Sequence, residues 1–180
     1  PIWNSLSRSR QDFAPYACMV ESMDENIGRI LKTLRSEDLE KDTLVIFFSD
    51  NGGLSTGSGP NMPTSSLPLR AGKGWLYEGG IRVPLIMKFP GKIKAGTKIP
   101  EPVVGTDLYP SILDLLGLPL HPEQHMDGES VKPLFSDKKS LNREAIYFHF
   151  PHYHHINSMG PSGAIRKGDF KLIEVFETGI

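Results

Sequence analysis

The stretch Thr43–Gly53 reads Thr-Leu-Val-Ile-Phe-Phe-Ser-Asp-Asn-Gly-Gly. The five apolar residues from Leu44 to Phe48 are mostly β-branched or aromatic, so they predict a central strand of a parallel sheet that is buried on both faces. The run ends abruptly, and Asp50 and Asn51 follow it. Both side chains should therefore emerge at the carboxyl end of the strand, where open α/β sheets form their ligand sites.

Asp50 and Asn51 offer hard oxygen donors side by side on a rigid support. Such donors suit Ca²⁺ or Mg²⁺, whereas Zn²⁺ would favour His or Cys at these positions. The sequence therefore predicts that Asp50 and Asn51 bind a metal ion. The alternative is an Asx-turn with a glycine exit, of which Asp-Asn-Gly is also typical.

An amphipathic helix is expected before this strand. From Pro15 to about Arg35, apolar residues recur at intervals of three and four: Tyr16, Met19, Val20, Met23, Ile27, Ile30, Leu31 and Leu34. This is the period of a helix with one apolar face. A short charged connection then leads into the strand. The order helix, strand, ligand loop is the repeating unit of a doubly wound α/β sheet, so we predict an α/β fold.

A second polar site is expected at Lys73, which lies between Gly72 and Gly74 after a long loop without periodicity. The flanking glycines let the backbone approach a ligand closely, and the aromatic residues that follow can exclude water from the ammonium group. The segment therefore indicates an anion site. The alternative is a glycine-rich surface turn with a solvated lysine. A phosphate-binding P-loop is excluded, because Gly74 replaces its Ser or Thr.

The rest of the chain contains further predicted elements. We expect a strand over 83–89, a solvated basic region over 88–98, a helix over 108–116 that is capped by Thr106 and ended by Gly117, a strand over 145–150 and a hairpin over 164–173. A two-stranded hairpin is marginal by itself, so the terminal hairpin needs more strands or a helix to pack against.

Histidines are concentrated in the segment His149-Phe150-Pro151-His152-Tyr153-His154-His155. Such a cluster can bind a transition metal. No acidic residue or cysteine accompanies it, however, and the intervening proline and aromatic residues are typical of a pocket wall. We therefore predict that His149, His152 and His154 contact a substrate, with an ordinary surface loop as the alternative.

Composition limits the possible functions. The chain has 180 residues, 38% hydrophobic residues and a net charge of -1, which describes an ordinary globular protein and gives no support for nucleic-acid binding. No apolar run approaches the roughly 20 residues of a membrane-spanning helix. No stretch has the order of a signal peptide. Cys18 is the only cysteine, which excludes an internal disulfide and a cysteine-based zinc site.

Four motifs occur in order along nearly the whole chain: Ser49-Asp50-Asn51-Gly52-Gly53; Gly72-Lys73-Gly74 with Tyr77-Glu78-Gly79-Gly80-Ile81-Arg82-Val83-Pro84; Gly105-Thr106-Asp107-Leu108-Tyr109-Pro110-Ser111-Ile112-Leu113; and Asp127-Gly128-Glu129-Ser130. Together they closely resemble the formylglycine-dependent sulfatases, arylsulfatase-like members of the alkaline-phosphatase-like superfamily. The resemblance implies part of an alkaline-phosphatase-like sheet flanked by helices over residues 1–150. The start of a small antiparallel C-terminal subdomain would follow over 151–180.

The resemblance also implies roles for individual residues. Asp50 and Asn51 would be ligands of the single Ca²⁺, with Mg²⁺ possible, and Lys73 would hold the sulfate group and its bridging oxygen. We add Arg166 to the histidines as a substrate-binding residue. The parent protein would hydrolyse a sulfated carbohydrate or an aryl sulfate in the periplasm or outside the cell.

The family nucleophile is a formylglycine made from the cysteine of a Cys-x-Pro-Ser-x-Arg motif. Cys18 is followed by Met19-Val20-Glu21 and does not match. The sequence therefore predicts a piece that is inactive alone. One alternative is a phosphatase or phosphodiesterase of the same superfamily, although such enzymes typically have Asp-His-Gly where this chain has Asp-Asn-Gly. Another is a non-catalytic carbohydrate-binding remnant. The strands and helices are too few to cover a doubly wound sheet. We therefore expect either an exposed apolar face or edge of the sheet, through which the chain could self-associate, or a partner chain that covers it.

Overall fold

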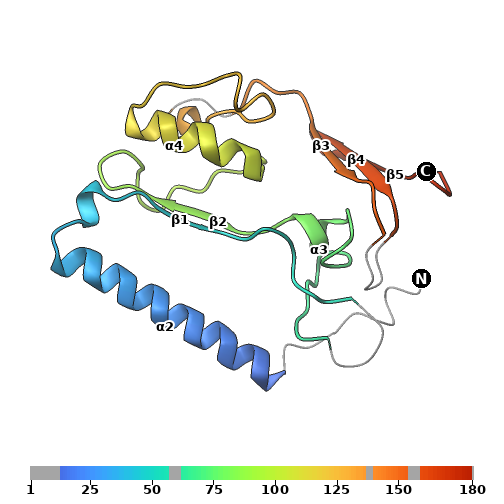
Figure 1. Ribbon diagram of the computed structural model, residues 1–180, viewed down its shortest axis with the longest axis horizontal. Helices are drawn as coiled ribbons and strands as arrows, with labels where there is room; N and C mark the ends of the chain where they lie inside the picture. The colour runs from blue at the N-terminus through green and yellow to red at the C-terminus, as the bar shows by residue number, and fades with distance from the viewer. Residues whose placement is uncertain (1–12, 57–61, 137–139, 154–158, 180) are drawn as a thin grey trace.

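The computed structural model describes residues 13–56, 62–136, 140–153 and 159–179. Figure 1 shows the long helix α2 (Ala14–Ser36) below a two-stranded sheet and the helix α4 (Leu108–Leu116) above it. The two-stranded sheet pairs β1 (Val45–Phe48) with β2 (Leu85–Lys88). A second sheet contains β3 (Ile146–Phe150), β4 (Ser162–Lys167) and β5 (Phe170–Val175). Helices and sheets thus combine as the predicted α/β class requires.

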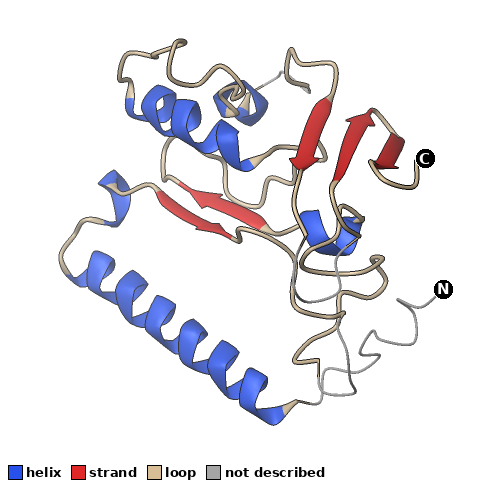
Figure 2. Ribbon diagram, turned by 45° about the vertical axis from the view of Figure 1, so that its right-hand side comes forward, coloured by secondary structure: helices blue, strands red, loops and turns tan. Residues whose placement is uncertain are grey.

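Four short elements complete the description. They are the one-turn helix α3 (Glu78–Ile81) and the 3₁₀ helices η1 (Glu40–Asp42), η2 (Gly105–Asp107) and η3 (Lys132–Phe135). In both ribbon views α3 lies at the end of the β1–β2 pair and close to the three-stranded sheet (Figures 1 and 2). No helix within the described ranges has the length and apolar character to span a membrane.

The predicted amphipathic helix is confirmed as α2. Pro15 lies in its first turn, where a missing N–H costs little. None of its residues is buried, and the apolar side chains of Met19 and Ile30 are 69% and 62% exposed. Part of the apolar face of α2 is therefore exposed, whereas Tyr16, Ile27, Leu31 and Leu34 on the same face are half-buried.

The prediction of a buried central strand in a parallel sheet is wrong for the part of the chain that the structure describes. β1 pairs only with β2, and the pairing is antiparallel, with Val45 opposite Lys88 and Phe48 opposite Leu85. The strand is half-buried and Phe48 is exposed. An apolar run indicates that both faces of a strand favour burial, but it does not indicate whether the neighbouring strand is parallel or antiparallel.

Helix α4 has the predicted limits but not the predicted cap. Gly117 ends it in the left-handed conformation, with φ of 73°, which glycine adopts without steric cost. At the amino end, Asp107 precedes the first residue of α4, but its side chain makes no capping bond to that helix. The Asp107 carboxylate accepts a hydrogen bond from the Val104 N–H at 2.9 Å, at the start of η2. The hydroxyl of Thr106 instead donates to the carbonyl of Asp127 at 3.3 Å. The prediction that Thr106 caps α4 is therefore wrong.

A buried ion pair holds the polypeptide around α4 together. The side chain of Asp107 is 1% exposed, and its two oxygens accept hydrogen bonds from the two terminal nitrogens of Arg143, each at 2.7 Å. Asp107 Oδ1 also accepts from the Glu129 N–H at 3.0 Å. Nearby, Val131, Leu134 and Leu141 form a buried apolar cluster. Asp107 thus ties α4 to the segment that leads into β3.

The predicted terminal hairpin is confirmed, and it spans Ser162 to Val175. β3 supplies the additional strand that an isolated hairpin lacks, because it pairs antiparallel with β4. Residue 150 as the boundary of a subdomain stays a prediction. The side chains alternate, so Ala164 and Arg166 face inward while Tyr147 and His149 are exposed on the other face.

Candidate active site

Asp50 and Asn51 lie directly after β1, at its carboxyl end as predicted. The backbone N–H and the side-chain Nδ2 of Asn51 both donate to Asp50 Oδ1, at 2.9 and 3.0 Å. Within the described residues, Asp50 Oδ2 and Asn51 Oδ1 make no hydrogen bond. Two oxygen atoms, one of them charged, therefore remain for a hard cation, and this donor set fits Ca²⁺ or Mg²⁺.

These two residues do not make a complete metal site. The described ranges contain no group of three or more His, Cys, Asp or Glu side chains that could hold a metal ion. Ca²⁺ prefers about 6–8 oxygen ligands, so most of its ligands would have to come from elsewhere.

The loop that carries Lys73 is held against the loop that follows Asn51. The Lys73 N–H donates to the carbonyl of Gly53 at 3.0 Å, and the Gly52 N–H donates to the carbonyl of Gly80 at 2.8 Å. The backbones approach so closely that a Cβ on Gly52 would lie 1.8 Å from the carbonyl oxygen of Gly79. Glycine is thus required for the two predicted sites to come together.

We expect Gly52→Ala to destabilise the chain by about 1–3 kcal/mol, the usual cost of overpacking, because the new methyl group collides with backbone that cannot rotate away. Urea denaturation measures the change in the free energy of unfolding. Gly28→Ala is the matched control: Gly28 lies within α2 with nothing within 4 Å of its Cβ position, and alanine should stabilise the helix by roughly 0.8–1 kcal/mol. Equal stability of the two variants would contradict the observed packing of the loops.

Two aromatic residues, Trp75 and Tyr77, follow Lys73 in its loop. The rings of Trp75 and Tyr77 stack with their centroids 6.0 Å apart, and the guanidinium of Arg70 lies 3.7 Å from the centroid of Tyr77. Lys73 is half-buried, and its ammonium forms no hydrogen bond or ion pair with the described residues. The ammonium therefore remains available for an anion.

Arg166 is the predicted substrate residue that shares a cavity with Asp50 and Asn51. All three line one cavity of about 1490 Å³ that opens between β1, β2 and the three-stranded sheet. His149 lies on the opposite face of that sheet, with its ring centroid 5.8 Å from that of Phe176. His152 is exposed, its ring centroid 4.0 Å from that of Phe150. His154 lies outside the described residues, and substrate contact by the histidines stays a prediction.

Sequence reasoning missed one interaction beside this site. Lys171 Nζ on β5 donates to Glu78 Oε1 at the start of α3, at 2.9 Å. The alternation of the hairpin places Lys171 on the same face as Arg166, its partner across the strands. This alternation could have drawn attention to Lys171, but no local pattern points to Glu78 as its partner.

Two family descriptions match the chain. Residues 4–118 match the family described as Sulfatase, and residues 71–179 match the one described as N-sulphoglucosamine sulphohydrolase, C-terminal. The chain belongs to the sulfatase family. The family to which the motifs pointed is therefore confirmed.

Two similar proteins support this membership. A sulfatase of Formosa agariphila is 36% identical over 166 residues, which cover 85% of this chain and 29% of that protein. The human steryl-sulfatase is 36% identical over 151 residues, which cover 79% of this chain and 26% of that protein. The chain thus spans less than a third of the length of these relatives.

Solved structures show the same fold. Ps i-CgsB in complex with k-i-k-neocarrahexaose matches 94% of this chain and 36% of its own, with a TM-score of 0.77 and 31% identity. BT4656 in complex with its substrate D-glucosamine-2-N, 6-O-disulfate matches 88% of this chain and 30% of its own, with a TM-score of 0.72 and 30% identity. The α/β arrangement described above is therefore that of sulfatase structures.

Proposed function

We propose that this chain is the C-terminal part of the catalytic unit of a sulfatase that hydrolyses sulfate esters. The observation that carries the proposal is the hydrogen bonding between the two loops, from the Lys73 N–H to the Gly53 carbonyl and from the Gly52 N–H to the Gly80 carbonyl. These bonds hold a carboxylate, a carboxamide and an ammonium group on neighbouring loops. Hydrolysis of a sulfate ester requires such a combination, because negative charge spreads over the sulfate oxygens and develops on the leaving oxygen.

In this proposal Asp50 and Asn51 hold Ca²⁺ through the side-chain oxygens that make no hydrogen bond within the described residues. When bound, the ion would supply positive charge that stabilises the transferring group. Lys73 binds the sulfate and its bridging oxygen through its ammonium group, and Trp75 and Tyr77 exclude water from that side. The formylglycine nucleophile is not among these residues, so this chain contributes binding and electrostatic stabilisation.

The substrate class that we propose is a sulfated carbohydrate. Two structural neighbours support this class: one was solved with a neocarrahexaose and the other with a disulfated glucosamine as its substrate. Sulfated polysaccharides lie outside the cytoplasm, so we also propose that the protein acts in the periplasm or outside the cell. Fractionation of cells that express the full-length protein tests the location.

A direct assay separates this function from phosphate ester hydrolysis. The full-length protein should hydrolyse para-nitrophenyl sulfate or a sulfated oligosaccharide, and it should leave para-nitrophenyl phosphate largely intact. The carboxamide of Asn51 favours this outcome, because transition-metal pairs in the phosphate-cleaving relatives need imidazole. Faster hydrolysis of the phosphate ester would overturn the proposal, and binding of a sulfated glycan without hydrolysis would indicate a carbohydrate-binding module.

Metal removal should distinguish the full-length protein from this chain. EDTA should abolish activity of the full-length protein and Ca²⁺ should restore it, whereas calorimetry on residues 1–180 should show only weak Ca²⁺ binding, because two side chains supply few of the about 6–8 ligands. Asp50→Ala should remove even that weak binding. Tight Ca²⁺ binding by residues 1–180 would contradict the assignment of only two ligands to this chain.

We further propose that the exposed part of the apolar face of α2 causes residues 1–180 to self-associate. Light scattering should show a mass above that of the monomer, and the double substitution Met19→Lys with Ile30→Lys should lower it, since both side chains are largely exposed. Glu25→Lys, on the polar face of the same helix, is the control and should change nothing. A monomeric wild-type chain would contradict this prediction.

A further inference from the structure

We propose that the ion pair between Lys171 and Glu78 is a positioning pair, through which the three-stranded sheet fixes both loops of the candidate active site. The inference rests on the proposed function for its effect on catalysis. Its structural part concerns the described residues alone and can be tested independently of catalysis.

The contact itself is well sheltered on the lysine side. The side chains of Lys171 and Glu78 are 16% and 32% exposed, and Nζ lies 2.9 Å from Oε1. Lys171 lies on β5, whose residues from 170 to 175 all pair with β4, so its backbone is held by a complete ladder. One partner of the pair is therefore fixed by the sheet.

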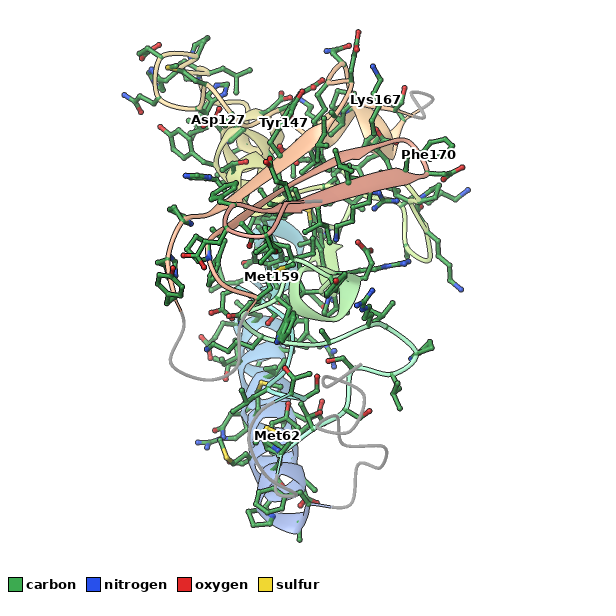
Figure 3. The ribbon with its side chains drawn as sticks, turned by 90° about the vertical axis from the view of Figure 1, so that its right-hand side faces the viewer. Met62, Asp127, Tyr147, Met159, Lys167 and Phe170 are labelled. Atoms are coloured by element: carbon green, nitrogen blue, oxygen red, sulfur yellow. The ribbon has the colours of Figure 1, made fainter. Side chains whose placement is uncertain are left out.

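The other partner is not fixed by its own element. Glu78 begins α3, which has only four residues. A single helical turn is not stable by itself, because the conformational entropy lost in forming the first turn exceeds the stabilisation from its hydrogen bonds. The position of α3 must therefore depend on contacts with its surroundings. Lys171 supplies one of these contacts. Met159 supplies a second beside it, since its sulfur accepts the Leu76 N–H at 3.4 Å, and Figure 3 shows Met159 close to α3.

Helix α3 in turn contacts both loops through backbone atoms. The Gly79 N–H donates to the carbonyl of Arg70 at 2.8 Å, three residues before Lys73. The carbonyl of Gly80 accepts the Gly52 N–H, next to Asn51. These backbones lie too close for a side chain between them: a Cβ on Gly79 would lie 2.5 Å from the carbonyl oxygen of Arg70, and a Cβ on Gly52 would lie 1.8 Å from that of Gly79. A displacement of α3 therefore displaces the lysine loop and the metal-ligand loop together.

Charge explains why an acidic residue is needed at this position. Arg166 and Lys171 lie directly opposite each other on β4 and β5, and two cations in this arrangement repel each other. Glu78 lines the same cavity as Arg166 and pairs with Lys171. Its carboxylate thus offsets the repulsion on the inward face of the sheet. Without Glu78 the two cations would remain uncompensated beside the site.

Partly exposed ion pairs add little to global stability, so loss of this pair should leave the chain folded and loosen only the loops. The test uses the full-length protein with the variants Lys171→Met and Glu78→Gln, which remove one charge each and keep most of the side-chain volume. The charge-swapped variant Glu78→Lys with Lys171→Glu should restore the pair. The measurements are kcat, KM, the melting temperature and amide hydrogen exchange at Gly52 and Gly79.

Lys167→Met is the matched control. It removes an ion pair on the same hairpin, between Lys167 and Glu144 at 2.8 Å, whose side chains are both largely exposed. Figure 3 shows Lys167 near the tip of the hairpin, away from α3. This variant should leave kcat and amide exchange unchanged.

For Lys171→Met and Glu78→Gln we expect kcat to fall by about tenfold to a hundredfold, the effect of a small misplacement of catalytic groups. KM should change less, the melting temperature should stay close to that of the control, and exchange at Gly52 and Gly79 should accelerate. The charge-swapped variant should recover most of kcat. Unchanged exchange at both glycines, or equal losses in Lys167→Met, would overturn the inference. If the wild-type protein hydrolyses no sulfate ester, the proposed function fails, while the exchange measurements still decide whether the pair holds the loops.

Discussion

Lys73→Ala should lower kcat/KM of the full-length protein for a sulfate ester by about 10²–10³-fold, the usual cost of removing one electrostatic contact to a transition state. The physical reason is that Lys73 is half-buried and its ammonium makes no ion pair or hydrogen bond with the described residues, so its charge is not already compensated. Steady-state kinetics with para-nitrophenyl sulfate measures the effect.

Lys32→Ala is a suitable control for this experiment, because Lys32 is an exposed lysine on α2 and does not line the cavity that contains Asp50 and Asn51. It should not change the rate. Lys73→Arg is informative as well: arginine keeps the charge but replaces a compact ammonium by a planar fork, so partial activity is expected. Near-normal turnover of Lys73→Ala would remove Lys73 from the site.

The second large effect is expected at the buried ion pair. Asp107→Ala should destabilise the chain by about 3–5 kcal/mol, because it leaves the Arg143 side chain, which is only 17% exposed, without its carboxylate partner. It also removes the acceptor for the Val104 and Glu129 N–H groups. Urea denaturation measures the loss in the free energy of unfolding.

Glu144→Ala is the control, since it removes an ion pair to Lys167 in which both side chains are largely exposed. Such pairs contribute about 0–1 kcal/mol. The double variant Asp107→Leu with Arg143→Met should lose less than Asp107→Ala, because it leaves no buried charge unpaired. If Asp107→Ala and Glu144→Ala were equally stable, the burial of Asp107 would not have the predicted energetic consequence.

The sequence was sufficient to predict individual residues of the candidate site, but not how the loops that carry them pack together. Asp50 and Asn51 were recognisable because they follow an apolar run, and Lys73 because two glycines flank it. The hydrogen bonds that join their loops involve glycine backbones, which have no side chain to leave a pattern in the sequence. The sequence also could not show that Arg166 lines the cavity while His149 lies on the opposite face of the sheet. Alternation along a strand shows that two faces exist, but the neighbouring strands decide which face is inside.

The sequence by itself determined the features that arise from short-range chemistry. The 3.6-residue period predicted α2, the left-handed glycine at Gly117 marked the end of α4, and the Gly-Asp turn predicted the β4–β5 hairpin. The sequence motifs were sufficient to identify the sulfatase family. Only the tertiary structure decided the antiparallel pairing of β1 with β2, the ion pair of Asp107 with Arg143, and the contact of Lys171 with Glu78, 93 positions apart. Local conformation depends on neighbours within one turn or strand, whereas these contacts depend on how distant segments pack.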